Sequence, residues 1–568
     1  MNSILKKIRD APFRIKIITV SVLLVLSILL VQPFQIRHPT IPFLFNQDNE
    51  VDITASGPYS ASNNGGNSEQ KARRVAIIGA GASGSSAAFF LKRASRVAES
   101  RLGLKEGSLL DEVVVFDKEG YIGGRTTIVY PYNDTSLRPQ EIGATLFVGS
   151  NKNMMKSVKF FNLTLVEPDI NDARVGIWDG TRFLSTTSSS TWFTSVKALW
   201  RYGYSPMKTK SVVTKMVNKM LKLYDSTYLS ERGPVESVED LVENIGLGHE
   251  YTSRTGQDLA KNVIGVNKNW LGEIWEGATR TNYASDMEHI HGLGAVVSLA
   301  TTGASQVEGG NRQIFEGMLA ESKAIVHLGT EVSEIIPLRS KDSLQYIIKS
   351  NKTELNDGNP FDAVFFAAPW HSSPIHNKNE LENQFLKPIP PTPYIRLQVT
   401  LFSTIKSRPE PSFFGLPEGS EVPSVIMTTG ITSREKKGIP PPRFQSISWH
   451  NPITISKDGT KAEMEYIVKV FSLTRINDRF IKELIGEKPN WLIRKEWDSY
   501  PKLKPIKTYP PTQPLKGFHY LAAQEPWIST METQTISTRE AVAKSVIEWW
   551  GIGLGECEDG DSWDWTCS

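Results

Sequence analysis

A glycine-rich turn between a predicted strand and a predicted helix constrains this chain more than any other feature. Residues 74–78 form a short, β-branched run that is typical of a buried parallel strand. The segment Gly79-Ala80-Gly81-Ala82-Ser83-Gly84 follows at once, and a helical pattern then runs from Ser83 to about Ala98. In such a turn the first glycine permits a tight bend, the second lets the backbone approach a diphosphate, and the third lets helix and strand pack closely.

A second predicted strand, Glu112 to Phe116, follows this helix, and Asp117 stands at its end. An acidic residue at this place accepts hydrogen bonds from a ribose. The helix N-terminus offers unpaired N–H groups and the positive end of its dipole to a diphosphate. This βαβ context predicts a dinucleotide-binding site rather than an ordinary glycine turn.

Length, charge and cysteine usage narrow the class of protein. A chain of 568 residues is long for one core, so two intertwined domains are expected. The net charge of +3 gives no reason to expect nucleic acid as a partner. Cys557 and Cys567 are the only cysteines, and in an oxidising compartment we expect them to form one short-loop disulfide. No metal-ligand spacing is apparent, so no metal site is expected.

The N-terminal residues predict entry into the secretory pathway. A basic segment precedes the apolar run Ile17 to Val31, as in a signal sequence. Continued to Ile36, the run approaches the roughly 20 residues that span a bilayer. Because no convincing small-x-small cleavage motif follows, an uncleaved signal anchor is favoured over a cleaved peptide.

Three sequons, at Asn133, Asn162 and Asn351, are candidate glycosylation sites. Together with the N-terminal segment they predict a glycoprotein of the secretory-pathway lumen, in a lysosome or vacuole. If the anchor is retained, the protein is attached to the membrane by a single transmembrane pass.

Four blocks resemble the flavin amine oxidase superfamily. Residues 117–125 resemble its extension in which an acidic residue precedes Gly-Gly-Arg, here Gly123-Gly124-Arg125. Residues 141–144 resemble its next flavin-proximal loop, residues 330–332 the segment that holds adenine, and residues 367–369 the strand end that returns under the cofactor. The resemblance implies FAD rather than NAD, in a site made by Gly79, Gly81, Ser83, Gly84, Asp117, Lys118, Gly123, Gly124, Arg125, Gly143, Ala144, Thr145, Val332, Ala368, Glu532 and Thr533.

Within that superfamily the chain resembles the prenylcysteine oxidase family, which includes the farnesylcysteine lyases. Blocks in matching order span residues 73 to about 550, and Val307-Glu308-Gly309-Gly310-Asn311 is the most specific of them. Two segments depart from the family pattern. Residues 522–527 replace an asparagine-glycine turn near the flavin, and the segment after Tyr283 carries Asp286, His289 and His291, near the substrate pocket.

The resemblance implies an α/β fold (α+β overall), in which a Rossmann-like FAD-binding domain is interleaved with a mixed-sheet substrate domain. The strand-rich region from Tyr394 to Phe471 fits the second domain. The expected ranges are 1–36 for the signal peptide or anchor, 37–70 for a flexible linker, 71–150, 290–375 and 510–550 for the FAD-binding domain, 151–289 and 376–509 for the substrate domain, and 551–568 for an acidic tail.

The reaction that the resemblance implies is oxidation of an S-prenyl cysteine. Flavin N5 takes a hydride from the allylic carbon attached to sulfur, water adds, and the hemithioacetal collapses to cysteine and a prenyl aldehyde. Molecular oxygen reoxidises the flavin to give hydrogen peroxide. An amine oxidase-like enzyme acting on another substrate, and a non-catalytic flavin-bearing carrier of prenyl lipid, remain alternatives.

Three side chains are candidates for roles at the reacting centre. Glu308 is the first, with Arg312 or a ribose as its partner, and a structural salt bridge is the alternative. Glu532 either lies at the flavin rim or complements a helix dipole. Tyr283, with Trp270, Trp275 and Trp370, either lines an isoprenoid tunnel or packs in the core. His289 and His291 are interpreted as loop or packing residues.

Overall fold

The computed structural model describes residues 71–171, 174–187, 198–341, 343–356, 358–455, 462–558 and 560–567. The signal segment predicted for residues 1–36 and the linker predicted for 37–70 lie outside the described residues. The chain divides into two compact units, Met1–Ser60 with Ser189–Trp200, and Ala61–Ser188 with Arg201–Ser568. Of the first unit only residues 198–200 are described, in helical conformation. Every feature below belongs to the second unit.

A five-stranded, fully parallel sheet forms the dinucleotide-binding part of the fold. Its strands, in order across the sheet, are β18 (Phe518–Tyr520), β12 (Ala363–Phe366), β1 (Arg73–Ile78), β2 (Leu110–Phe116) and β9 (Ile325–His327). The central strand β1 is buried from Val75 onward, as its unbroken apolar run predicts. Strand β2 begins two residues before the predicted Glu112.

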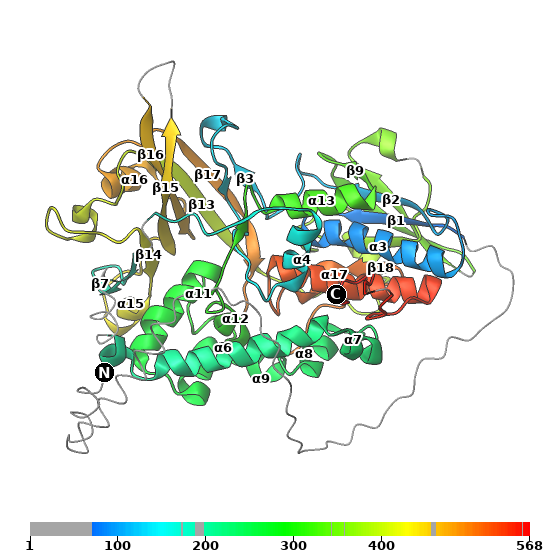
Figure 1. The fold of residues 1–568 in the computed structure, drawn as a ribbon, viewed down its shortest axis with the longest axis horizontal. Helices are drawn as coiled ribbons and strands as arrows, with labels where there is room; N and C mark the ends of the chain where they lie inside the picture. The colour runs from blue at the N-terminus through cyan, green and yellow to red at the C-terminus, as the bar shows by residue number, and fades with distance from the viewer. Residues whose placement is uncertain are drawn as a thin grey trace, which may run out of the picture. The chain divides into compact units, whose positions relative to one another are not determined.

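Three helices lie side by side against this sheet: α3 (Ala82–Arg101), α13 (Arg312–Ser322) and α17 (Met531–Trp550) (Figure 1). Gly84 in the first turn of α3 sits so close to β1 that an added Cβ would lie 1.8 Å from the carbonyl oxygen of Gly79. At the start of α17 the side chains and backbone of Thr530 and Thr533 form a reciprocal capping box.

A mixed, seven-stranded sheet forms the other half of this unit. Its strands, in order, are β17 (Leu492–Pro501), β13 (Tyr394–Thr404), β16 (Glu463–Ser472), β15 (Ser446–Ile455), β14 (Val425–Thr428), β6 (Val175–Trp178) and β7 (Phe183–Thr186). All neighbours are antiparallel except β14 and β6, which run parallel. The predicted fold class, a Rossmann-like part interleaved with a mixed-sheet part, is confirmed.

Further helices are α4 (Lys152–Phe160), α6 (Ser205–Leu221), α7 (Ser226–Arg232), α8 (Val238–Asn244), α9 (His249–Thr252), α10 (Gly256–Asp258), α11 (Glu276–Tyr283), α12 (Gly292–Val297), α14 (Lys378–Glu382), α15 (Ile431–Glu435) and α16 (Asp478–Ile485). Short 3₁₀ turns are η1 (Pro131–Asn133), η2 (Lys222–Tyr224), η5 (Thr353–Leu355), η6 (Pro411–Phe414) and η7 (Leu521–Gln524), and η3 (Leu259–Ile264) and η4 (Trp270–Trp275) are π-helical. Two-stranded ribbons join β3 (Ile128–Val129) to β4 (Gln140–Glu141), β5 (Leu165–Val166) to β8 (Gln306–Val307), and β10 (Val332–Arg339) to β11 (Leu344–Ser350).

The C-terminal residues 551–558 and 560–567 are packed onto the parallel half rather than trailing from it. Trp563 and Trp565 are buried, and their rings contact Phe90 and Phe89 of α3. Cys557 and Cys567 are bonded to each other. The expected acidic tail is therefore part of the folded body for as far as it is described.

The two sheets follow the predicted domain ranges. The parallel strands lie within 71–150, 290–375 and 510–550, and the seven-stranded sheet within 151–289 and 376–509. Both sheets belong to one compact unit, so their separation into two domains stays a prediction. Among the described residues, no helix has the length and apolar character needed to cross a membrane.

Candidate flavin and substrate cavity

One cavity of about 1000 Å³ collects most of the residues that the sequence singled out. That volume is at the upper end of the roughly 300–1,000 Å³ of small-molecule sites. One wall comes from the β1–α3 turn, the segment after β2 and the segment after β12. The facing wall comes from α6, α12 and the seven-stranded sheet, and the N-terminus of α17 closes one side.

Every predicted cofactor-binding residue lines this cavity except Gly84. Gly84 instead allows α3 to pack against the turn that carries Gly79. Gly81 has a different reason to be glycine, because its φ of −80° suits any residue and an added Cβ would meet no protein atom nearer than 3.7 Å. The absence of a side chain at Gly81 leaves space in the cavity and is not required for packing within the protein.

The chemistry of this wall fits a dinucleotide. Gly81 caps α3 with no side-chain hydrogen bond, so the helix N-terminus presents its free N–H groups to the cavity. The Asp117 carboxylate accepts hydrogen bonds from the backbone N–H groups of Ala80 (2.6 Å) and Glu119 (2.8 Å). It thereby ties the end of β2 to the glycine turn, and burial raises its pKa.

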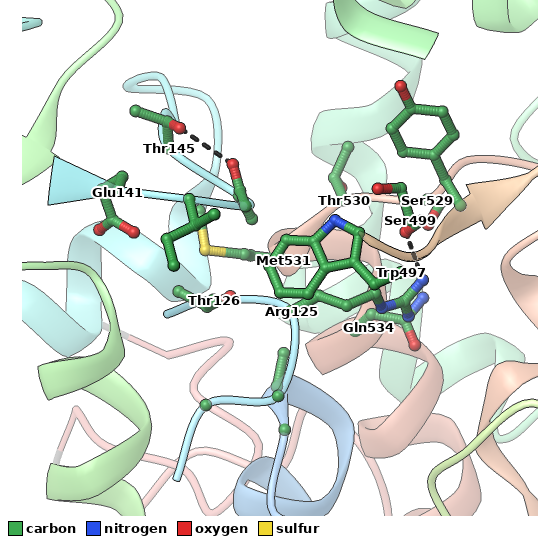
Figure 2. Close-up of a pocket in the computed structure, with 18 of the residues that line it drawn as sticks. Arg125, Thr126, Glu141, Thr145, Trp497, Ser499, Ser529, Thr530, Met531 and Gln534 are labelled. Carbon is green, nitrogen blue, oxygen red and sulfur yellow. Dashed lines mark hydrogen bonds between the residues drawn. The ribbon is translucent and has the colours of Figure 1, made fainter. Parts of the chain in front are cut away.

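Two buried donors on the cavity wall have no partner among the described residues. Gln534 Oε1 accepts a hydrogen bond from Ser83 Oγ (2.7 Å), but its Nε2 is unpaired. Trp497 Nε1 is unpaired as well. Figure 2 shows both side chains on the wall together with Arg125 and Met531. Because buried donors normally find acceptors, these atoms fit a cofactor with a polar, acceptor-rich ring, as a flavin has.

Arg125 is held by the protein itself. Its guanidinium pairs with both carboxylate oxygens of Glu525 and donates to the carbonyl oxygen of Ser499 (2.8 Å). Tyr394 Oη donates to the same carboxylate (2.8 Å). The carboxylate that holds this predicted cofactor-binding residue, Glu525, comes from the segment that departs from the family pattern. Arg125 therefore fastens the Gly123-Gly124 loop to the seven-stranded sheet and to the residue that follows η7.

A buried lysine and a buried glutamate stand at the sheet side of the cavity. Lys469 of β16 donates from Nζ to the carbonyl oxygen of Glu141 (2.8 Å) and to Thr145 Oγ1 (3.3 Å). Burial lowers the pKa of Lys469 to about 8 and raises the pKa of Glu141 to about 7. Glu141 Oε1 accepts from the backbone N–H of Asn311 (2.7 Å), whereas Oε2 is buried and unpaired.

Comparison with known proteins assigns the family. The model of the prenylcysteine lyase family matches residues 185–555, which include most of the seven-stranded sheet, α12 and α17. The model of the NAD(P)-binding Rossmann-like domain matches residues 77–161.

The chain belongs to the prenylcysteine lyase family. The farnesylcysteine lyase of Arabidopsis thaliana is 29% identical over 509 residues, which are 86% of this chain and 91% of that protein. Prenylcysteine oxidase 1 of Mus musculus is 26% identical and that of Homo sapiens 25%, each over 84% of this chain and 90% of the relative. A solved structure of cyclohexylamine oxidase from Brevibacterium oxydans aligns with 84% of this chain and 99% of its own, at 13% identity and a TM-score of 0.46.

The three candidates for the reacting centre have different places in this member of the family. Tyr283 is buried and lines the cavity, and its ring lies edge-on to that of Tyr500. Glu532 also lines the cavity, but its carboxylate accepts hydrogen bonds from the N–H groups of Asn153 and Met154 at the start of α4 and from the hydroxyl of Tyr224. It thus complements a helix dipole, that of α4 rather than of its own helix.

Glu308 is exposed and lies outside the cavity lining. Arg312, its expected partner, pairs with Glu316 (3.3 Å). The carboxylate that faces the cavity from this part of the fold is that of Glu141, which the backbone of Asn311 binds. The sequence singled out residues 141–144 by resemblance, but it gave no sign that the Glu141 carboxylate is buried at the cavity.

The apolar stripe of α6 and η2 contributes to both the core and the cavity wall. Met216, Val217, Met220 and Tyr224 line the cavity and also pack with the core cluster that includes Leu223 and Trp275. Trp270, Trp275 and Trp370 all lie outside the cavity lining. Trp275 and Trp370 are fully buried, and their indole N–H groups donate to the carbonyl oxygen of Ala295 and to the carboxylate of Glu382.

The two histidines behave as interpreted. His291 is buried, caps α12 through Nδ1 and contacts the carbonyl oxygen of Pro526 (3.1 Å). His289 is exposed, and with Asp286 and Glu288 it forms the one cluster in the described residues whose spacing could admit a metal ion. Arg434 pairs with both acidic residues of that cluster, so their charge is already balanced.

Proposed function

We propose that the chain is an FAD-dependent oxidase of S-prenyl-L-cysteine, with the farnesyl and geranylgeranyl thioethers as substrates. The overall reaction consumes the thioether, water and molecular oxygen, and it yields a prenyl aldehyde, cysteine and hydrogen peroxide. Membership of the prenylcysteine lyase family supports the proposal, as do the names of its relatives, farnesylcysteine lyase and prenylcysteine oxidase 1. Such an activity would serve the breakdown of prenylated proteins.

One observation carries the proposal: a single cavity joins a dinucleotide cradle to a long apolar wall. The cradle is the glycine turn with the N-termini of α3 and α17. The apolar wall includes Met216, Val217 and Met220 of α6, with Val297 and Ala300 at and after the end of α12. An isoprenoid chain is apolar along its whole length, so burying it against this wall is favourable at about 25 cal/mol per Å² of apolar area.

When bound, the flavin supplies the two-electron acceptor for the hydride that leaves the carbon next to sulfur. The protein's own residues orient the reactants and exclude water. The α6 side chains hold the isoprenoid, and the Arg125–Glu525–Tyr394 cluster fixes the Gly123-Gly124 loop. Since sulfur and the allylic double bond share the positive charge of the cation, the chain needs no strong base to form it.

The test uses protein loaded with FAD and S-farnesyl-L-cysteine in air. We expect peroxide, free thiol and farnesal in equal amounts. Peroxide from amines alone would instead identify an amine oxidase. A bound flavin that farnesylcysteine does not bleach without air would identify a non-catalytic carrier. Protein that binds no flavin would refute all three assignments.

We also propose that this reaction takes place in the lumen of the secretory pathway, in a lysosome or vacuole. Exposed asparagines at all three sequons, Asn133, Asn162 and Asn351, support this location, as does the Cys557–Cys567 disulfide. Digestion of the protein from its own cells with an N-glycosidase should increase its gel mobility. Unchanged mobility would contradict the location.

A further inference from the structure

Lys469 is a buried cation with capacity for one more partner. It is 6% exposed, and its ammonium group lies at the cavity among the carbonyl oxygen of Glu141, Thr145 Oγ1 and the ring of Phe471, whose centre is 5.3 Å away. An ammonium group has three N–H donors, and the described residues accept from two of them. None of the described carboxylates forms an ion pair with it.

Burying an ammonium group without a counter-ion is energetically unfavourable. Both of its protein acceptors are neutral, so hydrogen bonding compensates only part of that cost. The carboxylates of Glu141 and Asp169 act on it from a distance, and burial still keeps its pKa near 8. An anion delivered through the cavity would supply the missing partner.

Glu141 provides the complementary group on the same wall. Its carbonyl oxygen binds Lys469, and its carboxylate Oε2 is buried at the cavity without a donor. Figure 2 shows Glu141, the last residue of β4, and Thr145, which follows it in the chain. A cation of β16 thus contacts the same residue that carries the orphan carboxylate oxygen, an arrangement that matches a ligand with a carboxylate and an ammonium group close together. An α-amino acid is such a ligand.

Lys469 and Glu141 also lie at a suitable distance along the cavity for the head group of a prenylcysteine. The segment that carries Glu141 and Thr145 is joined to the cofactor cradle through residues 123–125, since Ala144 N–H donates to the carbonyl oxygen of Arg125 (3.0 Å) and Gly123 N–H donates to that of Ala80 (2.9 Å). In an S-prenyl cysteine only four bonds separate the carboxylate carbon from the carbon that is oxidised. An amino-acid head bound at Lys469 therefore keeps that carbon beside the cradle, while the prenyl chain extends toward the apolar wall.

We propose that Lys469 binds the α-carboxylate of the prenylcysteine and that Glu141 Oε2 accepts from its α-ammonium group. The inference rests on the proposed function and deepens it: the enzyme takes the free amino acid, and it discriminates against the carboxyl methyl ester and against the N-acylated or peptide-bound cysteine. Lys469 and Glu141 are specificity residues that contact substrate.

The test measures binding rather than turnover. S-Dodecyl-L-cysteine lacks the allylic double bond, so its binding to the FAD-loaded protein can be followed by calorimetry without reaction. Its methyl ester and its N-acetyl derivative each remove one charge. Wild-type protein should bind the free amino acid roughly 10-fold or more tightly than either derivative, because hydrogen bonds to charged groups contribute about 1.5–3 kcal/mol.

Lys469→Met should bind acid and ester alike, with the affinity of wild type for the ester, and should keep its preference over the N-acetyl derivative. Glu141→Gln should show the reverse pattern. Lys488→Met is the matched control, because Lys488 is exposed in the same half of the molecule and lies outside the cavity lining. It should bind all three ligands like wild type.

Two results would overturn the inference while leaving the proposed function intact. One is wild-type protein that binds acid and ester equally, a measurement that does not depend on any variant folding. The other is a folded, flavin-containing Lys469→Met protein that loses affinity for acid and ester by the same factor. Wild-type protein that neither binds these ligands nor oxidises farnesylcysteine would refute the proposed function, and this inference with it.

Discussion

Replacing Gly81 by alanine should weaken flavin binding without unfolding the protein. The backbone of Gly81 has an ordinary φ of −80°, and the new methyl group would meet Gly124 Cα at 3.7 Å and the carbonyl oxygen of Gly123 at 3.8 Å, which are normal contacts. Alanine is a poorer helix cap than glycine, but it also lowers the entropy of the unfolded chain by an amount of similar size. The free energy of unfolding of the flavin-free protein should therefore change by no more than about 1 kcal/mol.

The same methyl group enters the cavity where a diphosphate would contact the N-terminus of α3. Displacing the diphosphate from one N–H group loses about 1.5–3 kcal/mol, so the Kd for FAD should rise about 10- to 150-fold. Quenching of FAD fluorescence during titration of flavin-free protein measures this Kd, and thermal unfolding of the same sample measures stability.

Gly84→Ala is the contrasting variant. Its Cβ would lie 1.8 Å from the carbonyl oxygen of Gly79 and 3.1 Å from Ile77 Cγ2, so α3 must move away from β1 and stability should fall by about 1–3 kcal/mol or more. A stable Gly81→Ala protein whose Kd for FAD stays within about threefold of wild type would place the diphosphate elsewhere and refute the reasoning.

Three further predictions concern pH and stability. Since only the protonated Lys469 binds a carboxylate, the preference for acid over ester should be present below about pH 8 and lost above it, and a preference constant to pH 10 in calorimetry would argue against this assignment. Glu532→Ala leaves two N–H groups of α4 and a tyrosine hydroxyl without their acceptor, so urea unfolding should show a loss of about 3 kcal/mol or more, whereas an unchanged midpoint would show that water replaces the carboxylate. Reducing the Cys557–Cys567 disulfide, with a sequence separation of 10, should cost about 3 kcal/mol and lower Tm, and a double Cys→Ala variant with wild-type Tm would contradict this estimate.

The parallel half of the fold could be predicted because its signals are local. The β1 run, the three glycines and Asp117 lie within 45 residues of one another, and each has a physical reason that depends on its neighbours in sequence. The strands after Tyr394 could be predicted for the same reason. Their order across the sheet could not, since β14 pairs with β6, which lies about 250 residues earlier in the chain.

The inward-facing charges of the site could not be found by such signals. Lys469 alternates with apolar residues in β16, a pattern that equally fits a lysine facing solvent. Only its contact with the loop of Glu141, 328 positions earlier, shows that it is buried. The stripe of α6 poses the same difficulty, because helical periodicity identifies an apolar face but cannot tell whether protein or a ligand covers it.

The packing of Trp563 and Trp565 has a consequence for how the protein is made. Helix α3 is among the first parts of the described chain to be synthesised, yet Trp563 and Trp565 cover its Phe90 and Phe89, and β18 completes its sheet. During translation these aromatic rings of the parallel half therefore stay uncovered until Trp563 and Trp565 have been synthesised. Loss of Trp563 and Trp565 would therefore uncover aromatic rings on a helix that is synthesised more than 400 residues earlier.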